Sequence, residues 1–196
     1  MGIINVTPDS FSGDGVGHDI EAAVALGRRF AADGADLLDI GGESTRPNAL
    51  AVSDDEELRR VIPVIERLAS EVSLPLSVDT HKSEVARRAF SAGASMINDI
   101  WGLQKEPRLA ELAAQKGVPI ALMSNQRNSS CQDIMSEVTS DLKRAIEQAL
   151  SAGVLWENII IDPGIGFGKT QEQNLEVLQR LEELQTLGRP ILLGSS

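Results

Sequence analysis

The stretch LSVDTHKSEVARRAFSAGASMIND, residues 76–99, contains one full repeat of the pattern that decides the fold. An aliphatic run at Leu76–Asp79 is followed by helical apolar spacing over Ser83–Ala92, then by Gly93 and a second apolar run at residues 95–98. Glycine supplies the left-handed conformation in which many helices end. The order strand, helix, strand predicts parallel strands joined by a crossover helix.

The same alternation runs through the whole chain. Further strands are predicted at Gly2–Asn5, residues 36–40, Ile120–Met123, Ile159–Asp162 and residues 191–193. Further helices are predicted at Ile20–Ala32, Asp54–Glu71 and residues 107–116, 137–152 and 171–187. Because no linker or low-complexity stretch interrupts the pattern, we expect residues 1–196 to form a single domain.

Polar residues lie at the ends of most predicted strands: Asn5, Asp39, Asp79, Asn98, Ser124 and Asp162. A doubly wound sheet places its functional groups chiefly at one switch point, whereas a (β/α)8 barrel gathers them from many strand ends on one face. We therefore predict a (β/α)8 barrel with about seven strands present. Since such barrels usually need about 250 residues, we expect it to be truncated at the C-terminus and also at the N-terminus.

The composition excludes several classes of protein. The chain has 18 Lys and Arg against 29 Asp and Glu, a net charge of -11, which disfavours nucleic acids and anionic membranes as partners. A lone Cys131 excludes an intrachain disulfide and fits a reducing compartment. No signal peptide starts the chain and no apolar run approaches the roughly 20 residues of a membrane helix, so we expect a cytoplasmic enzyme.

Three polar stretches that follow predicted strands are candidate functional motifs. They are NVTPDSFS at residues 5–12, DIGGESTRP at residues 39–47 and DPGIGFGK at residues 162–169. In the second, paired glycines allow close approach to the backbone, and Thr45 with Arg46 can contact an anion. In the third, the carboxylate of Asp162 suits a ligand with two parallel N–H donors, as in an aminopyrimidinone ring.

Each motif also has a purely structural interpretation. The first could be an ordinary polar turn, and the second a loop in which Ser53 caps the next helix in front of Glu56. Asp162 could cap backbone amides of its own glycine loop. The glycines match neither the dinucleotide nor the Walker pattern, and His18 and His81 lack the spacing of a zinc site.

Together the motifs resemble those of dihydropteroate synthase, in this order: Asn-Val-Thr-Pro-Asp-Ser-Phe, Gly-Gly-Glu-Ser-Thr-Arg-Pro, Ser-Val-Asp-Thr, Ile-Asn-Asp and Asp-Pro-Gly-x-Gly-Phe-Gly-Lys. The resemblance implies condensation of p-aminobenzoate with 6-hydroxymethyl-7,8-dihydropterin diphosphate, giving dihydropteroate and diphosphate in folate synthesis. It also implies Mg²⁺ as cofactor, a homodimeric parent protein and inhibition by sulfonamides.

The same resemblance assigns roles residue by residue. It implies that Asp79, Asn98 and Asp162 hold the pterin, that Thr45 contacts the diphosphate and that Asn5 ligates Mg²⁺. Since Mg²⁺ prefers phosphate oxygens and water, one Asn is a plausible anchor. Further substrate contacts are expected at Phe11, Asp39, Pro47 and Phe167, and catalytic roles at Asp9, Asp14 and Arg46.

The chain departs from the family pattern in three places. The family usually has Ser-Asp-Gly-Gly where residues 12–15 read Ser-Gly-Asp-Gly, which displaces Asp14, and Met-His-Met-Gln where residues 123–126 read Met-Ser-Asn-Gln. Asn125 thus replaces an apolar pterin contact. The family's next Arg-Lys and a later Arg-x-His strand end would follow Ser196, so we expect the 196-residue polypeptide to have little synthase activity.

Two other functions remain open at this stage. A methyltetrahydrofolate:corrinoid methyltransferase would also keep a strand-end Asp and Asn for a pterin, but it expels no diphosphate and has no evident use for the motif at residues 43–47. A non-catalytic pterin-binding homologue is the alternative outside enzymes. It would have no reason to retain both a metal anchor at Asn5 and a pterin carboxylate at Asp79 or Asp162.

Overall fold

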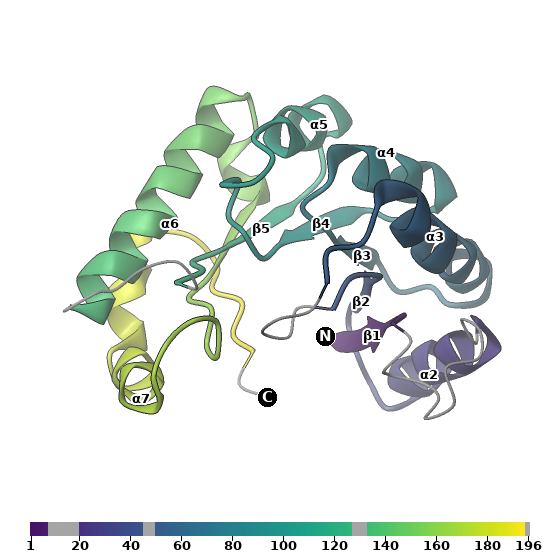
Figure 1. Ribbon diagram of the computed structural model, residues 1–196, viewed down its shortest axis with the longest axis horizontal. Helices are drawn as coiled ribbons and strands as arrows, with labels where there is room; N and C mark the ends of the chain where they lie inside the picture. Colours follow the sequence, from purple (N-terminus) through teal and green to yellow (C-terminus); the bar gives the residue numbers. More distant parts are fainter. Residues whose placement is uncertain (8–19, 45–49, 127–132, 195–196) are drawn as a thin grey trace. The chain divides into compact units, whose positions relative to one another are not determined.

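A computed structural model describes residues 1–7, 20–44, 50–126 and 133–194. The chain forms two compact units, Met1–Asn98 and Asp99–Ser196. Helices and parallel strands alternate in both units (Figure 1). None of the described helices is both long and apolar enough to cross a membrane. The expectation of one domain over the whole chain stays a prediction.

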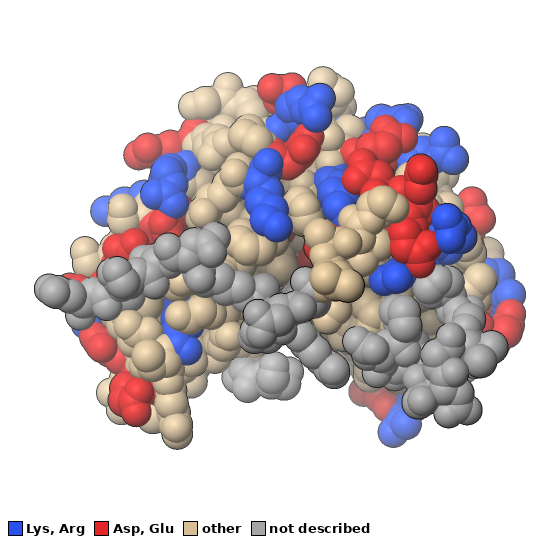
Figure 2. Space-filling model, in the orientation of Figure 1, with Lys and Arg blue, Asp and Glu red and all other residues tan. Residues whose placement is uncertain are grey.

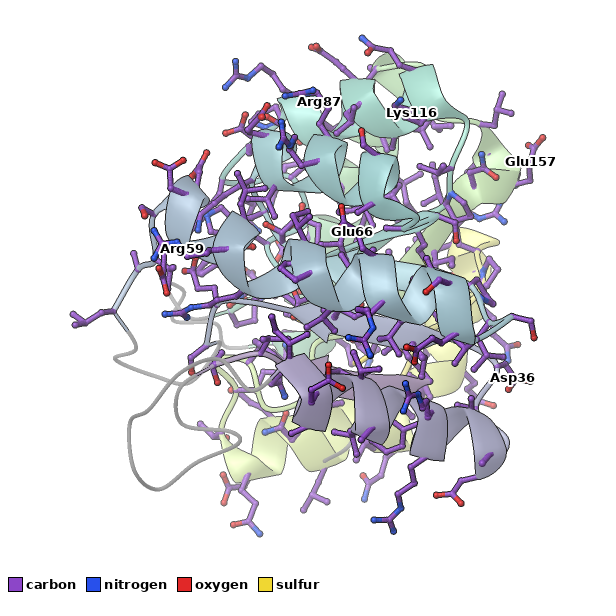
Figure 3. All side chains as sticks on the ribbon, turned by 90° about the vertical axis from the view of Figure 1, so that its right-hand side faces the viewer. Asp36, Arg59, Glu66, Arg87, Lys116 and Glu157 are labelled. Carbon is purple, nitrogen blue, oxygen red and sulfur yellow. The ribbon has the colours of Figure 1, made fainter. Side chains whose placement is uncertain are left out.

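The first unit is built on parallel strands in sequence order. These strands are β1 (Gly2–Asn5), β2 (Leu38–Gly41), β3 (Leu76–Asp79) and β4 (Met96–Asp99), the last of which crosses into the second unit by one residue. The helices are α2 (Ile20–Ala32), α3 (Asp54–Glu71) and α4 (Ser83–Ala92), and they lie side by side along one face of the strands (Figures 1 and 3).

The two faces of these strands differ in chemistry because successive side chains of a strand alternate in direction. Toward the helices, the strands present fully or almost fully buried apolar side chains: Ile4, Leu38, Ile40, Leu76, Val78 and Ile97. The opposite face carries Asp39, Ser77, Asp79 and Asn98. Burial of the first set stabilises the unit, and the second set is left to form a polar site.

The second unit pairs β5 (Ile120–Met123) with β6 (Ile159–Asp162) in parallel, with Met123 opposite Asp162. Its helices are α5 (Arg108–Lys116), α6 (Ile134–Ser151) and α7 (Gln171–Gln179), with short 3-10 helices at Trp156–Asn158 and Leu181–Leu187. A parallel bridge joins Ile161 to Ile191 after the last of these.

Three predicted elements differ from the observed ones. Helix α6 begins at Ile134, before residue 137, because the Asp133 side chain accepts a hydrogen bond from the Ser136 backbone N–H at 3.1 Å and caps the helix there. The helix predicted over 171–187 ends at Gln179, since Arg180 leaves the helical conformation and a 3-10 helix follows.

The third difference concerns the predicted strand at residues 191–193, which is reduced to the single bridge at Ile191. The backbone N–H of Ile161 donates to the carbonyl of Pro190, and that of Leu192 donates to the carbonyl of Ile161. Pro190 has no N–H to extend the ladder toward the N-terminus. Other boundaries move by one or two residues.

Candidate functional site

The ends of the four strands of the first unit place Asn5, Gly41, Asp79 and Asn98 in register as neighbours. Gly41 has no side chain, and a Cβ built there would lie 3.4 Å from Oδ2 of Asp79 and 3.7 Å from Oδ1 of Asn5. Both oxygens therefore border the same position, which the glycine leaves open. The predicted strand-end residues of this unit are brought together as expected from the sequence.

The side chain of Asn98 is held in place by a hydrogen bond to Asp39. The Nδ2 atom of Asn98 donates to Oδ2 of Asp39 at 2.9 Å, and the two residues are 8% and 2% exposed. Burial raises the pKa of Asp39, while the nearby Ser77 hydroxyl and the Asn98 amide act in the opposite direction. Among the described residues, Oδ1 of Asp39 has no hydrogen-bond partner. Asp39, which the resemblance placed among the substrate contacts, thus supports Asn98.

A second cluster, which we name the Lys82 clamp, consists of Glu43, Val52, Glu57 and Lys82. The ammonium of Lys82 donates to Oε2 of Glu43 at 2.6 Å, to Oε2 of Glu57 at 2.5 Å and to the carbonyl of Val52 at 2.6 Å. Burial raises the pKa of Glu57, and hydrogen bonds from Lys82 and Thr80 offset this only in part. For Lys82, burial lowers the pKa, but the two carboxylates outweigh it and the net pKa is raised.

The backbone next to the clamp is fixed against α3. Arg60 donates from one guanidinium nitrogen to the carbonyl of Gly42 at 2.8 Å and from Nε to Glu56 at 2.9 Å. A Cβ at Gly42 would approach Cγ1 of Val61 to 2.7 Å, so only glycine fits there. The Ser53 side chain accepts a hydrogen bond from the Glu56 backbone N–H and so caps α3, as the structural interpretation of this motif predicted. Capping of the helix does not conflict with a functional role for the residues before it.

In the second unit, Asp162 ends β6 and turns back on its own glycine loop. Its Oδ1 atom accepts a hydrogen bond from the backbone N–H of Gly164 at 2.7 Å. Burial raises the pKa of Asp162 to about 6, although the Gly164 hydrogen bond and the charge of Lys169 lower it. The structural alternative for Asp162 is therefore observed, in that its carboxylate caps one backbone amide of the glycine loop.

The glycine loop is packed tightly against the end of β5. Lys169 is 9% exposed and donates to the carbonyls of Ser124 at 3.2 Å and of Gly164 at 2.8 Å. Gly164 has φ +68°, and a Cβ there would lie 2.2 Å from the Ser124 oxygen. The Gln126 N–H donates to the carbonyl of Phe167 at 3.2 Å. This packing holds the backbone that carries Asp162 and Phe167.

The two residues that depart from the family pattern, Ser124 and Asn125, are both buried and hydrogen-bonded. Asn125 is 6% exposed and donates from Nδ2 to the carbonyl of Ile100 at 3.0 Å. Gln126 donates to Asp141 at 2.6 Å and Ser124 donates to the same carboxylate at 3.1 Å. The polar side chain of Asn125 is thus hydrogen-bonded to protein, as buried amides normally are.

Six predicted site residues lie outside the described residues: Asp9, Phe11, Asp14, Thr45, Arg46 and Pro47. Several charged residues of the observed clusters were given no role from the sequence: Glu57, Arg60, Lys82, Asp141 and Lys169. Lys169 closes the glycine motif and Lys82 follows the third predicted strand end by three positions, so both carried a positional signal. Glu57 carried no such signal, because it is one of several acidic residues in the first turn of its helix.

The outer surface of the helices carries exposed charged side chains, among them a network of Glu21, Arg28, Arg67 and Glu71 between α2 and α3. Acidic and basic side chains are interspersed over α3 and α4 on the face drawn in Figure 2. Arg59, Glu66 and Arg87 extend from these helices into solvent (Figure 3). Several of these exposed charges form pairs between neighbouring turns, such as Arg87 with Glu84, and such pairs contribute little to stability.

Comparisons with known proteins identify relatives of this chain. Residues 1–196 match the family model "Pterin binding enzyme". The chain is 50% identical over 196 residues to the dihydropteroate synthase of Clostridium beijerinckii, covering all of this chain and 73% of the relative. Its structure resembles that of Xanthomonas albilineans dihydropteroate synthase with 4-aminobenzoic acid, with a TM-score of 0.93 at 52% identity over 99% of this chain and 71% of that one.

A second Xanthomonas albilineans structure, in complex with 7,8-dihydropteroate, gives a TM-score of 0.90 at 49% identity over 99% of this chain and 71% of that one. Identities this high over nearly the whole chain establish a common fold. They confirm the predicted fold class, an incomplete (β/α)8 barrel, in which the described residues form six strands and one bridge in place of about seven strands.

Proposed function

The chain belongs to the pterin-binding enzyme family, and we propose that it catalyses the reaction of its dihydropteroate synthase relatives. In this reaction the amine of p-aminobenzoate displaces diphosphate from the methylene carbon of a dihydropterin. One C–N bond forms, the C–O bond to the diphosphate breaks, and the amine loses a proton. The products are dihydropteroate and diphosphate.

The observation that supports this function most is the row of strand ends formed by Asn5, Gly41, Asp79 and Asn98. It combines a carboxylate, two amides and an open position over the glycine at the carboxyl ends of parallel strands. This is the edge where barrel enzymes place their catalytic groups. No nucleophilic side chain is needed, since the amine of p-aminobenzoate itself attacks the methylene carbon.

The pterin is assigned to residues that match its hydrogen-bonding edge. The 2-amino-4-oxo ring presents parallel N–H donors, and such donors pair with a carboxylate. Asp79 and Asp162 are the two carboxylates assigned to the ring. Asn98 keeps its Nδ2 toward Asp39, which leaves its carbonyl oxygen to accept from a ring N–H. Each residue binds the ring without changing its own covalent state.

We assign Mg²⁺ to Asn5, whose side-chain oxygen borders the open position over Gly41. An amide oxygen near a carboxylate is a donor set that suits this ion, which otherwise keeps water and phosphate ligands. Within the described residues, no three His, Cys, Asp or Glu side chains cluster around a possible ion. When bound, Mg²⁺ would neutralise charge on the departing diphosphate.

The other roles follow the motifs. Thr45 and Arg46 contact the diphosphate, Asp9 and Asp14 act near the reacting groups, and Phe11, Pro47 and Phe167 enclose p-aminobenzoate. An apolar enclosure keeps water from the cationic methylene carbon, which would otherwise be hydrolysed. Such a reaction is served by positioning and electrostatics.

We further propose that the protein works in the cytoplasm. A lone cysteine, Cys131, leaves no possibility of an intrachain disulfide, which fits a reducing compartment. Both proposed substrates are small molecules, and the net charge of -11 disfavours nucleic acids as additional partners.

The direct test supplies p-aminobenzoate, pterin diphosphate and Mg²⁺ to the gene product that contains this chain. We expect dihydropteroate and diphosphate in equal amounts, and a loss of at least about a hundredfold in kcat/KM for Asp79→Asn. Asp36→Asn, an identical change at an exposed position (Figure 3), should retain full activity. No diphosphate release in this assay, together with methyl transfer when methyltetrahydrofolate and a corrinoid acceptor are supplied instead, would identify the protein as a methyltransferase.

A further inference from the structure

We propose that Lys169 is a positioning residue that orients the Asp162 carboxylate for the pterin by taking over a backbone hydrogen bond at the end of β5. This inference rests on the proposed function, in which Asp162 binds the pterin ring. It concerns a lysine that was given no role from the sequence. Lys169 does not contact the pterin in this account, because its ammonium is directed to backbone carbonyls.

The backbone pairing of β5 with β6 stops one hydrogen bond short of Gly164. Met123 lies opposite Asp162, and the N–H of Ser124 donates to the carbonyl of Asp162 at 2.9 Å. In a parallel ladder, the next bond would run from the N–H of Gly164 to the carbonyl of Ser124. That N–H donates instead to Oδ1 of the Asp162 side chain, at 2.7 Å. The Ser124 carbonyl is therefore left to another donor.

Lys169 supplies that donor. Its Nζ atom binds the carbonyl of Ser124 at 3.2 Å and that of Gly164 at 2.8 Å, and the residue is 9% exposed. Ser124 is fully buried, and a buried carbonyl without a partner costs about as much as a lost hydrogen bond. The ammonium thus satisfies the end of β5, fastens the glycine loop to it and leaves the Gly164 N–H for the carboxylate.

The close approach of the two segments makes this exchange of donors possible. Gly164 has φ +68°, and a Cβ there would lie 2.2 Å from the Ser124 oxygen, so the two backbones are in contact. Without the ammonium, the Ser124 carbonyl and the Asp162 carboxylate would compete for the Gly164 N–H. The carboxylate would then lose its fixed orientation, on which paired hydrogen bonds to a planar ring depend.

The charge of Lys169 acts in the same direction as its geometry. Burial raises the pKa of Asp162 to about 6, while the Gly164 hydrogen bond and the positive charge of Lys169 lower it. The neighbouring carboxylate of Asp141 is occupied by three other donors: Ser124, Gln126 and Arg144. Removal of the ammonium would therefore raise the pKa of Asp162 further, and less of the carboxyl would be ionised near neutral pH.

The test titrates 6-hydroxymethyl pterin into the gene product that contains this chain, by calorimetry at several values between about pH 5 and pH 7.5. For the unsubstituted protein we expect the affinity to fall below about pH 6, where Asp162 gains a proton. Lys169→Gln keeps an N–H donor but removes the charge. It should bind about tenfold more weakly at pH 7, the scale of one charge-assisted hydrogen bond, and its loss of affinity should begin at a higher pH.

Three further variants serve as comparisons under the same titrations. Lys169→Arg keeps the charge and should restore the pH at which affinity falls. Asn174→Ala loosens the same loop without removing the ammonium, because the Asn174 side chain accepts from the Gly166 N–H at 2.8 Å. It should lower affinity by the same factor at every pH. Lys116→Gln, at an exposed lysine of α5 (Figure 3), should change nothing.

A second measurement needs no substitution. Because the Gly164 N–H is bonded to the carboxylate, its NMR amide proton shift in the unsubstituted protein should titrate with a midpoint at about pH 6. This measurement decides the matter if melting curves show that Lys169→Gln does not fold. A Gly164 amide shift that does not change between about pH 5 and pH 7.5 overturns the inference.

The outcomes separate this inference from the proposed function. If the unsubstituted protein binds no pterin at any pH, the proposed function is wrong and the role of Lys169 falls with it. If it binds the pterin, and Lys169→Gln weakens binding by one factor at every pH as Asn174→Ala does, then Lys169 is only structural and the inference is overturned. A shift of the pH dependence in Lys169→Gln that Lys169→Arg reverses supports it.

Discussion

Asn98 donates a hydrogen bond to Asp39 at 2.9 Å within the polar face of the first unit, and this bond decides which end of the Asn98 amide faces a ligand. Both residues are almost fully buried. An amide whose donor is occupied in this way presents its carbonyl oxygen as the acceptor. The proposed recognition of a pterin N–H by Asn98 therefore depends on a residue that does not itself need to touch the pterin.

This dependence predicts energetic coupling between the two side chains. Asp39→Ala leaves a buried donor of Asn98 unpaired and should lower the free energy of unfolding by about 1–3 kcal/mol. In a double-mutant cycle with Asn98→Ala, measured by urea unfolding, we expect a coupling of about 1 kcal/mol. Strict additivity of the two substitutions would show that the bond contributes nothing.

The raised pKa of Asp162 predicts a pH dependence of stability. The carboxyl has its ordinary pKa of 3.8 in the unfolded chain and a pKa of about 6 in the folded protein. Well below pH 3.8 it is protonated in both states; as the pH rises from about 4 to about 6, the unfolded chain releases its proton first, and the free energy of unfolding falls by about 3 kcal/mol. Above that pH the loss stays constant.

Asp162→Asn isolates this effect, because Asn can still accept from the Gly164 N–H while it does not titrate. Asp99 has a similarly raised pKa of about 6, so the stability of the unsubstituted protein depends on pH for this second reason as well. The contribution of Asp162 is therefore obtained by comparing the two proteins at each pH. The difference in unfolding free energy between Asp162→Asn and the unsubstituted protein should grow in favour of Asn between about pH 4 and pH 6. A difference that does not change over this range contradicts the assignment.

The glycine loop offers a matched pair of substitutions. Gly164 and Gly166 both have positive φ, +68° and +82°, but a Cβ at Gly164 would meet the Ser124 oxygen at 2.2 Å whereas nothing lies within 4 Å at Gly166. Gly166→Ala should cost about 1 kcal/mol of backbone strain, and Gly164→Ala clearly more. Equal losses in thermal unfolding would mean that the contact with Ser124 relaxes freely.

Substitutions at Gly41 and Gly42 should distinguish an effect on ligand binding from an effect on the stability of the fold. A Cβ at Gly41 makes only ordinary contacts, at 3.4 Å or more, so Gly41→Ala should fold normally. It fills the position between Asn5 and Asp79, and we expect binding of pterin diphosphate in the presence of Mg²⁺ to fall at least about tenfold. Gly42→Ala should instead destabilise the fold by about 1–3 kcal/mol, because its Cβ would overlap Val61. Calorimetric titration and thermal melting distinguish the two.

Much of this fold was predictable because its elements repeat a local pattern. The bounds of α3 and α4 follow from apolar spacing, and β3 ends at the predicted Asp79. The start of α6 was predicted three residues too late because the helix is capped by the side chain of Asp133. The end of α7 before Arg180 is not marked by any change in the apolar spacing of the sequence. Such boundaries depend on side-chain hydrogen bonds and on packing, which periodicity does not report.

The site was predictable to the extent that its residues stand at strand ends. Register alone brings Asn5, Asp79 and Asn98 together. The partners of Lys82 are 25, 30 and 39 residues away in sequence, and no spacing rule links them. The support of Asn98 by Asp39, 59 residues apart, is hidden in the same way, because a strand-end aspartate reads equally well as a ligand contact.

The central claim is that the strand-end row binds a pterin through Asp79. The most direct measurement is calorimetric titration of the protein and of Asp79→Asn with 6-hydroxymethyl pterin, with Asp36→Asn as the matched control. We expect saturable binding to the unsubstituted protein and to Asp36→Asn, and a loss of about a hundredfold or more for Asp79→Asn, since a carboxylate that accepts from a pterin N–H is removed. Equal affinity in all three proteins would contradict the assignment of the pterin to this row.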